Sequence, residues 1–88
     1  MPTALDPYGG LMLTVYSTTW CGYCVRLKKM LDREGIQYAE VNIEEDEAAA
    51  HLVEGVNGGN RTVPTVIFPD GTALTNPSID QVKQALAA

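Results

Sequence analysis

Hydrophobic and polar positions alternate along residues 11–18, LMLTVYST, where β-branched and aromatic side chains are also frequent. Both properties favour a strand. Over residues 24–34 the apolar side chains instead recur every three or four positions, which predicts an amphipathic helix that ends at Gly35. Residues 36–43, IQYAEVNI, return to the strand pattern. A strand, a helix and a second strand in this order predict a right-handed crossover between two parallel strands.

A second helix is predicted over residues 46–56, and the NGGN segment ends it. Its predicted apolar face is Ala48, Ala49, Leu52, Val53 and Val56, and its predicted polar face is Glu47, Ala50, His51 and Glu54. We therefore expect the first of these two faces to pack on the sheet.

The last third of the chain predicts a hairpin followed by a helix. Residues 62–68, TVPTVIF, and residues 72–75, TALT, have strand character, and a PDG turn joins them. Ser78 and Gln81 have the spacing of a capping box, which predicts that the closing helix begins there. The complete order, β-α-β-α-β-β-α, predicts an α/β fold in which three helices cover both faces of a four-stranded mixed sheet.

Length and composition limit the organisation of the chain. Its 88 residues suit one domain, and we assign residues 11–88 to it and residues 1–10 to a short flexible lead-in. The longest apolar stretches are far shorter than the roughly 18 residues that a membrane span needs. The first ten residues have neither the basic start nor the apolar run of a signal peptide. A cytoplasmic location, where thiols are kept reduced, is therefore expected.

The net charge of −5 does not suit a general nucleic-acid-binding protein. Basic residues are concentrated just after the two cysteines, where Arg26, Lys28, Lys29 and Arg33 outnumber two acidic residues. A solvated helix face is the simplest interpretation of each of these residues taken singly. Taken together, they are expected to place positive charge near the cysteines.

Both cysteines of the chain, Cys21 and Cys24, lie where the first predicted strand gives way to the first predicted helix. A structural disulfide here would close a loop of only about four residues, which stabilises less than a long loop does. A structural zinc ion needs four ligands, whereas the pair supplies two and the single histidine, His51, is expected on a polar helix face. We therefore expect a reactive redox pair and no metal site.

A thiol at a helix start has a physical reason to be reactive. Unpaired N–H groups there, with Arg26, Lys28 and Lys29 nearby, favour a thiolate at Cys21. A thiol of low pKa is also a good leaving group, so a mixed disulfide formed on it is resolved quickly. Cys24 belongs to the apolar face of the helix and is expected to be less exposed. We assign Cys21 as the nucleophile and Cys24 as an optional resolving thiol.

Further residues are expected around the nucleophile. Trp20 and Tyr23 flank it, and they either pack into the fold or form an exposed apolar wall that receives a partner. The segment RTVP supplies the other candidates for substrate binding: Arg61, Thr62, Val63 and Pro64. If the Val63–Pro64 bond is cis, the backbone of Val63 is expected to face outward and to pair with an extended substrate.

These motifs together resemble those of a known family. WCGYC at the start of the first helix, TVP at the start of the third strand and the order of elements resemble the glutaredoxin branch of the thioredoxin fold. The segments TTWCGYCVRLK, VNGGNRTVPTV and DGTALTNPS are similar to those of the mycoredoxins, actinobacterial glutaredoxin-like proteins that work with mycothiol. The resemblance implies a thiol–disulfide oxidoreductase in which Cys21 attacks, Cys24 is the second cysteine, and Val63 and Pro64 form the cis-proline wall.

Three departures from common glutaredoxins favour mycothiol over glutathione as the co-substrate. Glycine replaces the proline of CPYC; residues 75–78 replace the Gly-Gly-Cys-Asp-Asp segment that commonly holds the amine end of glutathione; and Thr18 and Thr19 stand where a lysine is often found. Mycothiol lacks the carboxylates of glutathione and needs fewer charged clamps. The resemblance implies mycothiolated or disulfide-containing protein substrates, indirect dependence on mycothiol disulfide reductase, a monomer and no tightly bound cofactor.

Two other functions stay open at this point. A dithiol electron donor, of the kind that serves ribonucleotide reductase and is reduced by thioredoxin reductase, would need both cysteines. A dimer could instead bridge an iron–sulfur cluster, as some glutaredoxins with glycine in the motif do. Substitution of Cys24 tests the first, and the colour and mass of anaerobically purified protein test the second.

Overall fold

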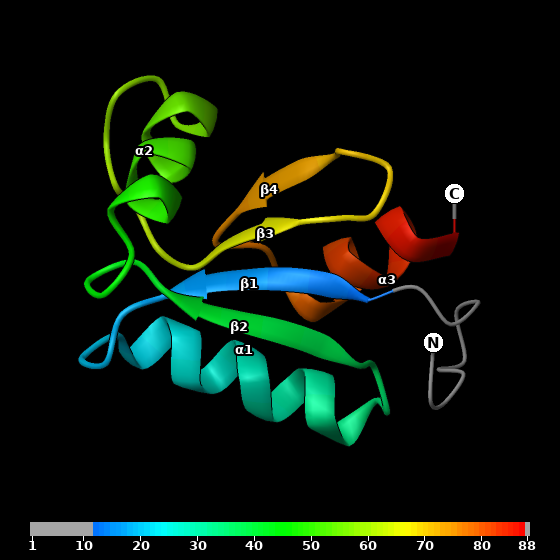
Figure 1. Ribbon diagram of the computed structural model, residues 1–88. Coiled ribbons are helices and arrows are strands. Elements are labelled where there is room, and N and C mark those ends of the chain that lie inside the picture. Colours follow the sequence, from blue (N-terminus) through cyan, green and yellow to red (C-terminus); the bar gives the residue numbers. More distant parts are fainter. Residues whose placement is uncertain (1–11, 88) are drawn as a thin grey trace.

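The computed structural model describes residues 12–87 of the chain and contains the seven predicted elements in the predicted order (Figure 1). They are β1 (Leu13–Ser17), α1 (Gly22–Arg33), β2 (Tyr38–Asn42), α2 (Glu47–Val56), β3 (Thr65–Ile67), β4 (Ala73–Thr75) and α3 (Ile79–Ala87). The predicted lead-in, residues 1–10, lies outside the described residues. No helix in the described part of the chain is long and apolar enough to cross a membrane.

The four strands form one mixed sheet in the order β2-β1-β3-β4. β1 pairs with β2 in parallel and with β3 in antiparallel orientation, and β3 pairs with β4 in antiparallel orientation. The predicted parallel pair and the predicted hairpin are therefore both confirmed. β3 begins at Thr65 rather than at residue 62, because Pro64 has no N–H for the ladder. β1, which leads into the cysteines, lies in the interior of the sheet.

α1 and α3 pack on one face of the sheet (Figure 1). The buried core of this face consists of large apolar side chains: Leu13, Val15, Leu27, Leu31, Ile36, Val66, Phe68 and Val82. Leu27 and Leu31 lie one turn apart on α1, as the predicted helical spacing requires. Because each such side chain contributes about 1.5–3 kcal/mol on full burial, this face supplies most of the hydrophobic stabilisation.

α2 covers the opposite face of the sheet with smaller side chains (Figure 1). Ala49, Ala50 and Val53 are the buried residues of this helix. The predicted apolar face is therefore partly wrong: Ala50 is 0% exposed, whereas Leu52 and Val56 are 45% and 38% exposed. The two adjacent alanines lie against the sheet, so the helix is turned by roughly one residue position from the predicted orientation.

The side chain of Asn57, directly after α2, joins this helix to the sheet. Its Nδ2 donates to the carbonyl of Val53 and to Thr65 Oγ1, both at 3.0 Å. Its Oδ1 accepts a hydrogen bond from Thr75 Oγ1. One amide group therefore connects α2, β3 and β4, just before the segment that leads to Pro64.

The ends of the other two helices follow the predicted signals. α1 is followed by Gly35 with φ of 72°, a left-handed conformation that glycine adopts at little cost. Ser78 and Gln81 form the predicted capping box: the Ser78 N–H donates to Gln81 Oε1 at 2.8 Å, and the Gln81 N–H donates to Ser78 Oγ at 3.1 Å.

Candidate active site

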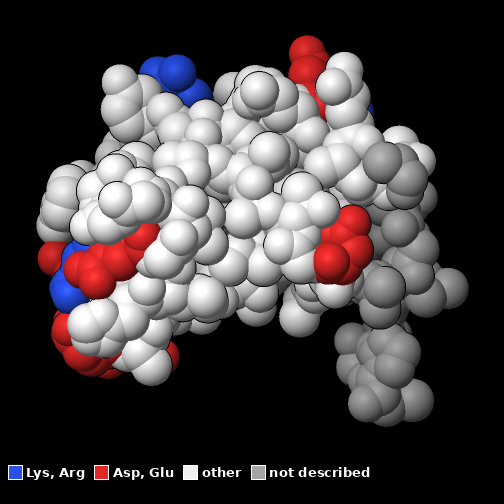
Figure 2. All heavy atoms as spheres, turned by 90° about the horizontal axis from the view of Figure 1, so that it is seen from above, with Lys and Arg blue, Asp and Glu red and all other residues white. Residues whose placement is uncertain are grey.

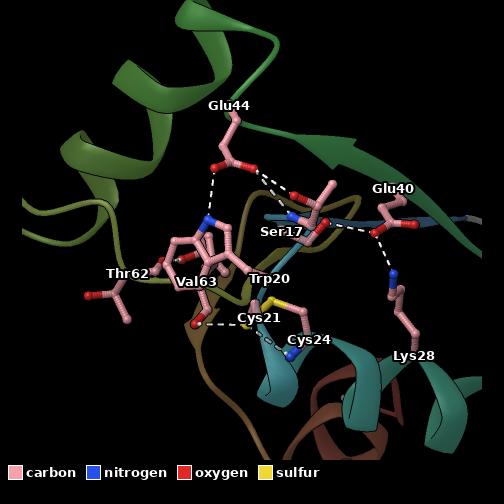
Figure 3. Close-up of a disulfide and its surroundings, with 11 residues drawn as sticks. Ser17, Trp20, Cys21, Cys24, Lys28, Glu40, Glu44, Thr62 and Val63 are labelled. Carbon is pink, nitrogen blue, oxygen red and sulfur yellow. Dashed lines mark hydrogen bonds and ion pairs between the residues drawn. A yellow bond between two sulfur atoms is a disulfide. The ribbon is translucent and has the colours of Figure 1, made fainter.

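Cys21 is the N-cap residue of α1 and lies just beyond the carboxyl end of β1. It is bonded to Cys24 in a disulfide with a Cα–Cα distance of 5.2 Å, a separation that disulfides commonly span. The backbone N–H of Cys24 donates to Cys21 Sγ at 3.0 Å (Figure 3). Both cysteines are buried, and Cys24 is the less exposed of the two, as predicted.

This position at the helix start explains which sulfur is suited to attack. The first N–H groups of a helix have no partner within the helix, and they favour negative charge at the N-cap. In the disulfide form the N–H of Cys24 points at the sulfur of Cys21, and we expect the same donor to favour the Cys21 thiolate after reduction. Cys24 lies on the face of α1 that packs into the protein, so its sulfur lacks this stabilisation.

The predicted positive charge near Cys21 is distributed differently in the structure. Lys28 Nζ lies 2.6 Å from Glu40 on β2, in an ion pair, and Ser17 Oγ donates to the same carboxylate at 2.7 Å (Figure 3). The hydrogen bonds from Lys28 and Ser17 hold the pKa of Glu40 below its usual value. Arg26 lies over the ring of Tyr23 at 5.9 Å from its centroid. Lys28 and Arg26 thus have other partners, whereas the N–H of Cys24 at the helix start contacts Cys21 Sγ directly.

The segment before β3 forms the other side of the site. The Val63–Pro64 peptide bond is cis, and the carbonyl oxygen of Val63 lies 3.8 Å from Cys21 Sγ (Figure 3). Val63 precedes the ladder, which begins at Thr65. Asn76 N–H donates to the carbonyl of Pro64 at 2.7 Å and fixes this turn from the side of α3. The structure thus brings Val63 and Cys21 together, as the sequence predicted.

Arg61 was predicted in the same segment, but its guanidinium group contacts α2. It forms ion pairs with Glu54 and, at 3.0 Å, with Glu47. These carboxylates raise the pKa of Arg61, and Arg61 in turn lowers the pKa of Glu54. His51 contacts both glutamates from the outer side of α2, which confirms its predicted surface position. Figure 2, which views the molecule from above, shows acidic and basic side chains lying together at its left edge, and other charged side chains elsewhere on this face.

Trp20 and Tyr23 are 74% and 60% exposed beside the buried sulfur of Cys21. Of the two interpretations that the sequence left open, packing into the fold is excluded by this exposure. The indole Nε1–H of Trp20 donates to Glu44 Oε2 at 2.8 Å, and the N–H and hydroxyl of Thr19 donate to Oε1 at 3.3 and 3.1 Å. The bond from Trp20 is the main reason that the pKa of Glu44 is lowered.

Glu44 is the residue of this site that the sequence did not reveal. It follows β2, which lies parallel to β1, so both residues that Glu44 contacts lie beyond the same edge of the sheet. Residues that follow two paired parallel strands lie at the same edge of the sheet, and this relation could have pointed to Glu44 from the sequence. A lone glutamate in a run of acidic residues carries no other indication.

A groove of about 370 Å³ extends from Tyr23 along the side of α1 that faces α3. Its walls are apolar at Leu27, Met30, Pro77 and Ile79 and polar at Arg26, Asn76, Ser78 and Gln81. Because Asn76 is hydrogen bonded to Pro64, one wall of the groove is continuous with the cis-proline segment. Asn76, Pro77 and Ser78 therefore border a cavity next to the cysteine motif.

Within residues 12–87 there is no group of three or more histidine, cysteine and acidic side chains that could hold a metal ion. The two cysteines are bonded to each other in the disulfide. The described residues thus offer thiol–disulfide chemistry at one point, the cysteine pair at the start of α1.

A four-stranded α/β fold with a cysteine pair at the start of α1 and a cis-proline facing it defines a thiol–disulfide oxidoreductase of the thioredoxin-fold class. The comparison with protein families identifies the family within this class. A glutaredoxin family profile matches residues 13–73, and the chain belongs to the glutaredoxin family.

Individual relatives narrow this assignment. A protein of Mycobacterium tuberculosis (strain H37Rv) described as a glutaredoxin is 62% identical over 74 residues, which are 84% of this chain and 88% of that protein. Mycoredoxin 1 of Corynebacterium glutamicum is 47% identical over 70 residues, 80% of this chain and 86% of the relative. The predicted resemblance is confirmed: the chain is a mycoredoxin-like glutaredoxin.

Solved structures agree with the fold. The glutaredoxin of Methanosarcina mazei Go1 superposes with a TM-score of 0.75 at 23% identity, over 88% of this chain and 79% of that one. The buckwheat glutaredoxin, solved as a complex with glutathione, gives a TM-score of 0.68 at 27% identity, over 88% of this chain and 73% of that one.

Proposed function

We propose that this protein reduces mixed disulfides between proteins and mycothiol, and that Cys21 alone carries the reaction. The observation that carries the proposal is the position of Cys21 Sγ at the helix start, between the N–H of Cys24 and the carbonyl of Val63. The similarity to Mycoredoxin 1 supports mycothiol as the thiol concerned.

In the proposed reaction, the Cys21 thiolate attacks the mycothiol sulfur of the mixed disulfide. A new bond joins Cys21 to mycothiol, the old sulfur–sulfur bond breaks, and the protein leaves as a thiolate that takes up a proton. The thiolate of a second mycothiol then attacks the mycothiol sulfur held by Cys21. This step releases mycothiol disulfide and restores the Cys21 thiolate, and a flavin-dependent mycothiol disulfide reductase supplies the electrons that regenerate mycothiol.

The surroundings of the cysteines support a thiol without carboxylates. Arg61, the basic residue of the RTVP segment, is already paired with Glu47 and Glu54, and Thr18 and Thr19 occupy the place of the common lysine. The groove beside Tyr23 offers the neutral hydrogen-bonding groups of Asn76, Ser78 and Gln81 over an apolar floor, with Arg26 as the one charged residue of its lining, a combination that suits a sugar conjugate. Glutathione, the ligand of the buckwheat relative, is the competing co-substrate.

The protein part of the substrate is proposed to bind on the other side of Cys21. We propose that Trp20, Thr62, Val63 and Pro64 contact it, because the Val63 carbonyl lies 3.8 Å from Cys21 Sγ and Val63 lies outside the sheet ladder. An extended peptide can add to such a backbone edge by main-chain hydrogen bonds. We place this activity in a cytoplasmic monomer with no tightly bound cofactor.

The test compares reductase-coupled turnover with mycothiol and with glutathione on one mycothiolated protein. We expect mycothiol to support turnover and glutathione to support much less. Cys21→Ser should abolish turnover and Cys24→Ser should retain it. Equal rates with both thiols would refute the mycothiol preference, and an inactive Cys24→Ser protein would refute the single-cysteine scheme.

The disulfide between Cys21 and Cys24 favours one second candidate, a dithiol electron donor. In that function the pair transfers two electrons to a client disulfide and ends as the disulfide seen here. If the protein is such a dithiol donor, thioredoxin reductase should reduce the Cys21–Cys24 disulfide. The mycothiol scheme does not need this reaction.

A further inference from the structure

The carboxylate of Glu44 holds the turn that precedes the reactive cysteine. Its two oxygens accept three hydrogen bonds, one from the indole of Trp20 at 2.8 Å and two from Thr19 at 3.3 and 3.1 Å. Figure 3 shows this carboxylate reaching from the end of β2 to the indole, on the side of the site where Thr62 and Val63 lie. Glu44 thus connects the β2–α2 loop to the two residues directly before Cys21.

An exposed tryptophan held in this way is ordered before any partner arrives. Trp20 is 74% exposed, and a free side chain of this exposure would sample several rotamers that a docking peptide must restrict. A hydrogen bond to a charged acceptor is stronger than one between neutral groups. The hydrogen bond from Trp20 to Glu44 can therefore remove part of the entropic cost that a peptide pays when it docks against the indole.

We propose that Glu44 is a positioning residue that fixes the indole of Trp20 as a wall beside Cys21, against which the peptide part of a mixed disulfide docks. The inference rests on the proposed function, because it requires that Cys21 exchanges with disulfides of proteins or peptides. It assigns Glu44 to recognition of the protein half of the substrate, whereas the groove beside Tyr23 is assigned to the small thiol.

The negative charge of Glu44 suggests an alternative role, an electrostatic effect on the Cys21 thiolate. The two roles predict different effects of substituting Glu44. A carboxylate near the helix start would disfavour the Cys21 thiolate, so its removal by either Gln or Ala would affect exchange with every disulfide. A positioning role predicts instead that Glu44→Gln, whose amide oxygen can still accept from the indole N–H although its NH2 cannot accept from Thr19, keeps more of the recognition than Glu44→Ala. Glu44→Ala would then lose the most recognition, and only for substrates with a peptide.

The kinetic experiment uses the full chain and two substrates: a mixed disulfide of mycothiol with a short apolar peptide, and bis(2-hydroxyethyl) disulfide, which has no peptide. We expect Glu44→Ala to raise KM for the peptide substrate roughly fivefold, the size of an ordering cost for one large side chain, with kcat unchanged. Its rate on the small disulfide should stay the same. Glu45→Ala is the matched control, because it removes the same charge from the adjacent residue, which is exposed.

A spectroscopic readout tests the same point without turnover. Trp20 is the only tryptophan of the chain, so its fluorescence anisotropy reports the freedom of this one indole. Anisotropy should fall in Glu44→Ala and be kept in Glu44→Gln and Glu45→Ala. In a Trp20→Ala background, Glu44→Ala should add no further rise in KM.

Three results would overturn the proposal: an unchanged anisotropy in Glu44→Ala, an equal rise in KM in Glu44→Gln, or an additional rise in the Trp20→Ala background. Failure of the proposed function is separate, since it would show as absent turnover with mycothiol. In that case single-turnover attack of reduced protein on a peptide disulfide would still measure the effect of Glu44.

Discussion

The α1–α3 face of the sheet is filled by eight large or medium-sized apolar residues, whereas the α2 face has two alanines, Val53 and Ile43. The difference is made up on the α2 side by directed polar contacts, of which those of Asn57 join a helix to two strands. Apolar contacts are not directional, so the first face can hold the fold without fixing fine positions. Hydrogen bonds require particular geometry, so the second face fixes where its segments lie.

This difference matters because the two faces serve different parts of the site. α1 brings Cys21 and Cys24, and it is anchored in the large apolar core. The segment that ends in Val63 and Pro64 follows α2, and the side chain of Asn57 ties its start to the sheet. We therefore infer that the first face mainly determines stability, and that the second also determines how the cis-proline segment is presented to Cys21.

The largest expected effect is on the apolar face. Leu31 is fully buried in that core, and Leu31→Ala should lower the free energy of unfolding by about 2–5 kcal/mol, through lost burial and a residual cavity. Urea denaturation with a fluorescence readout measures the change. Turnover per folded molecule should be kept, and a cost below about 1 kcal/mol would contradict this division between the faces.

Asn57→Ala is expected to have the next largest effect. It removes three side-chain hydrogen bonds that join α2 to β3 and β4, those with Val53, Thr65 and Thr75, at a total cost of about 1–3 kcal/mol. Unlike Leu31→Ala, it should also lower kcat/KM under conditions where the protein is fully folded. Undiminished activity in folded Asn57→Ala protein would remove the proposed link between the α2 face and the cis-proline segment.

A smaller effect is expected from Glu40→Gln, the main ionic contact on the α1 side. Because the folded-state pKa of Glu40 lies below its usual value, its contribution to stability is present above the ordinary carboxyl pKa and is lost as pH falls through the folded-state pKa. The partly exposed pair with Lys28 contributes about 0.2–1 kcal/mol at neutral pH. The variant should lose this amount at pH 7 and should differ less from the unchanged protein at pH 3. An equal loss at both pH values would argue against an ionic role.

The smallest effect is expected on the exposed side of α2. Leu52 is 45% exposed, so Leu52→Ser should change the free energy of unfolding by no more than about 0.5 kcal/mol. Parallel urea titrations of this variant and Leu31→Ala make the contrast direct. A loss above about 2 kcal/mol would mean that α2 buries the face predicted from the sequence after all.

The sequence supports the prediction of the α1 side more fully than that of the α2 side, for a physical reason. On α1 the buried positions Leu27 and Leu31 are the strongly apolar ones, so periodicity identifies the face. On α2 the buried residues include Ala49 and Ala50, which are almost as compatible with solvent as with a core, while Leu52 points outward. Hydropathy therefore favoured the wrong orientation of this helix.

The site shows the same limit. Cys21, Cys24 and the Val63–Pro64 segment could be predicted because each carries a local signal, a thiol spacing or a proline at a strand start. The pairing of Arg61 with Glu47 and Glu54, and of Glu44 with Trp20, depends on contacts between segments distant in sequence. The partners of Arg61 follow from the orientation of α2, which periodicity did not resolve, and the partner of Glu44 follows from the parallel pairing of β1 with β2.

The strand order has a consequence for how the protein is made. β1 pairs with β2 within the first half of the chain, but its other neighbour is β3, as in the pair Val15 and Val66. At roughly 5–20 residues per second, the ribosome adds the second half several seconds after the cysteines. During this interval the nascent chain carries both thiols without the carbonyl of Val63 beside them. The reactive centre is thus completed only when the last strands emerge, so a truncated translation product would present two cysteines in an unfinished site.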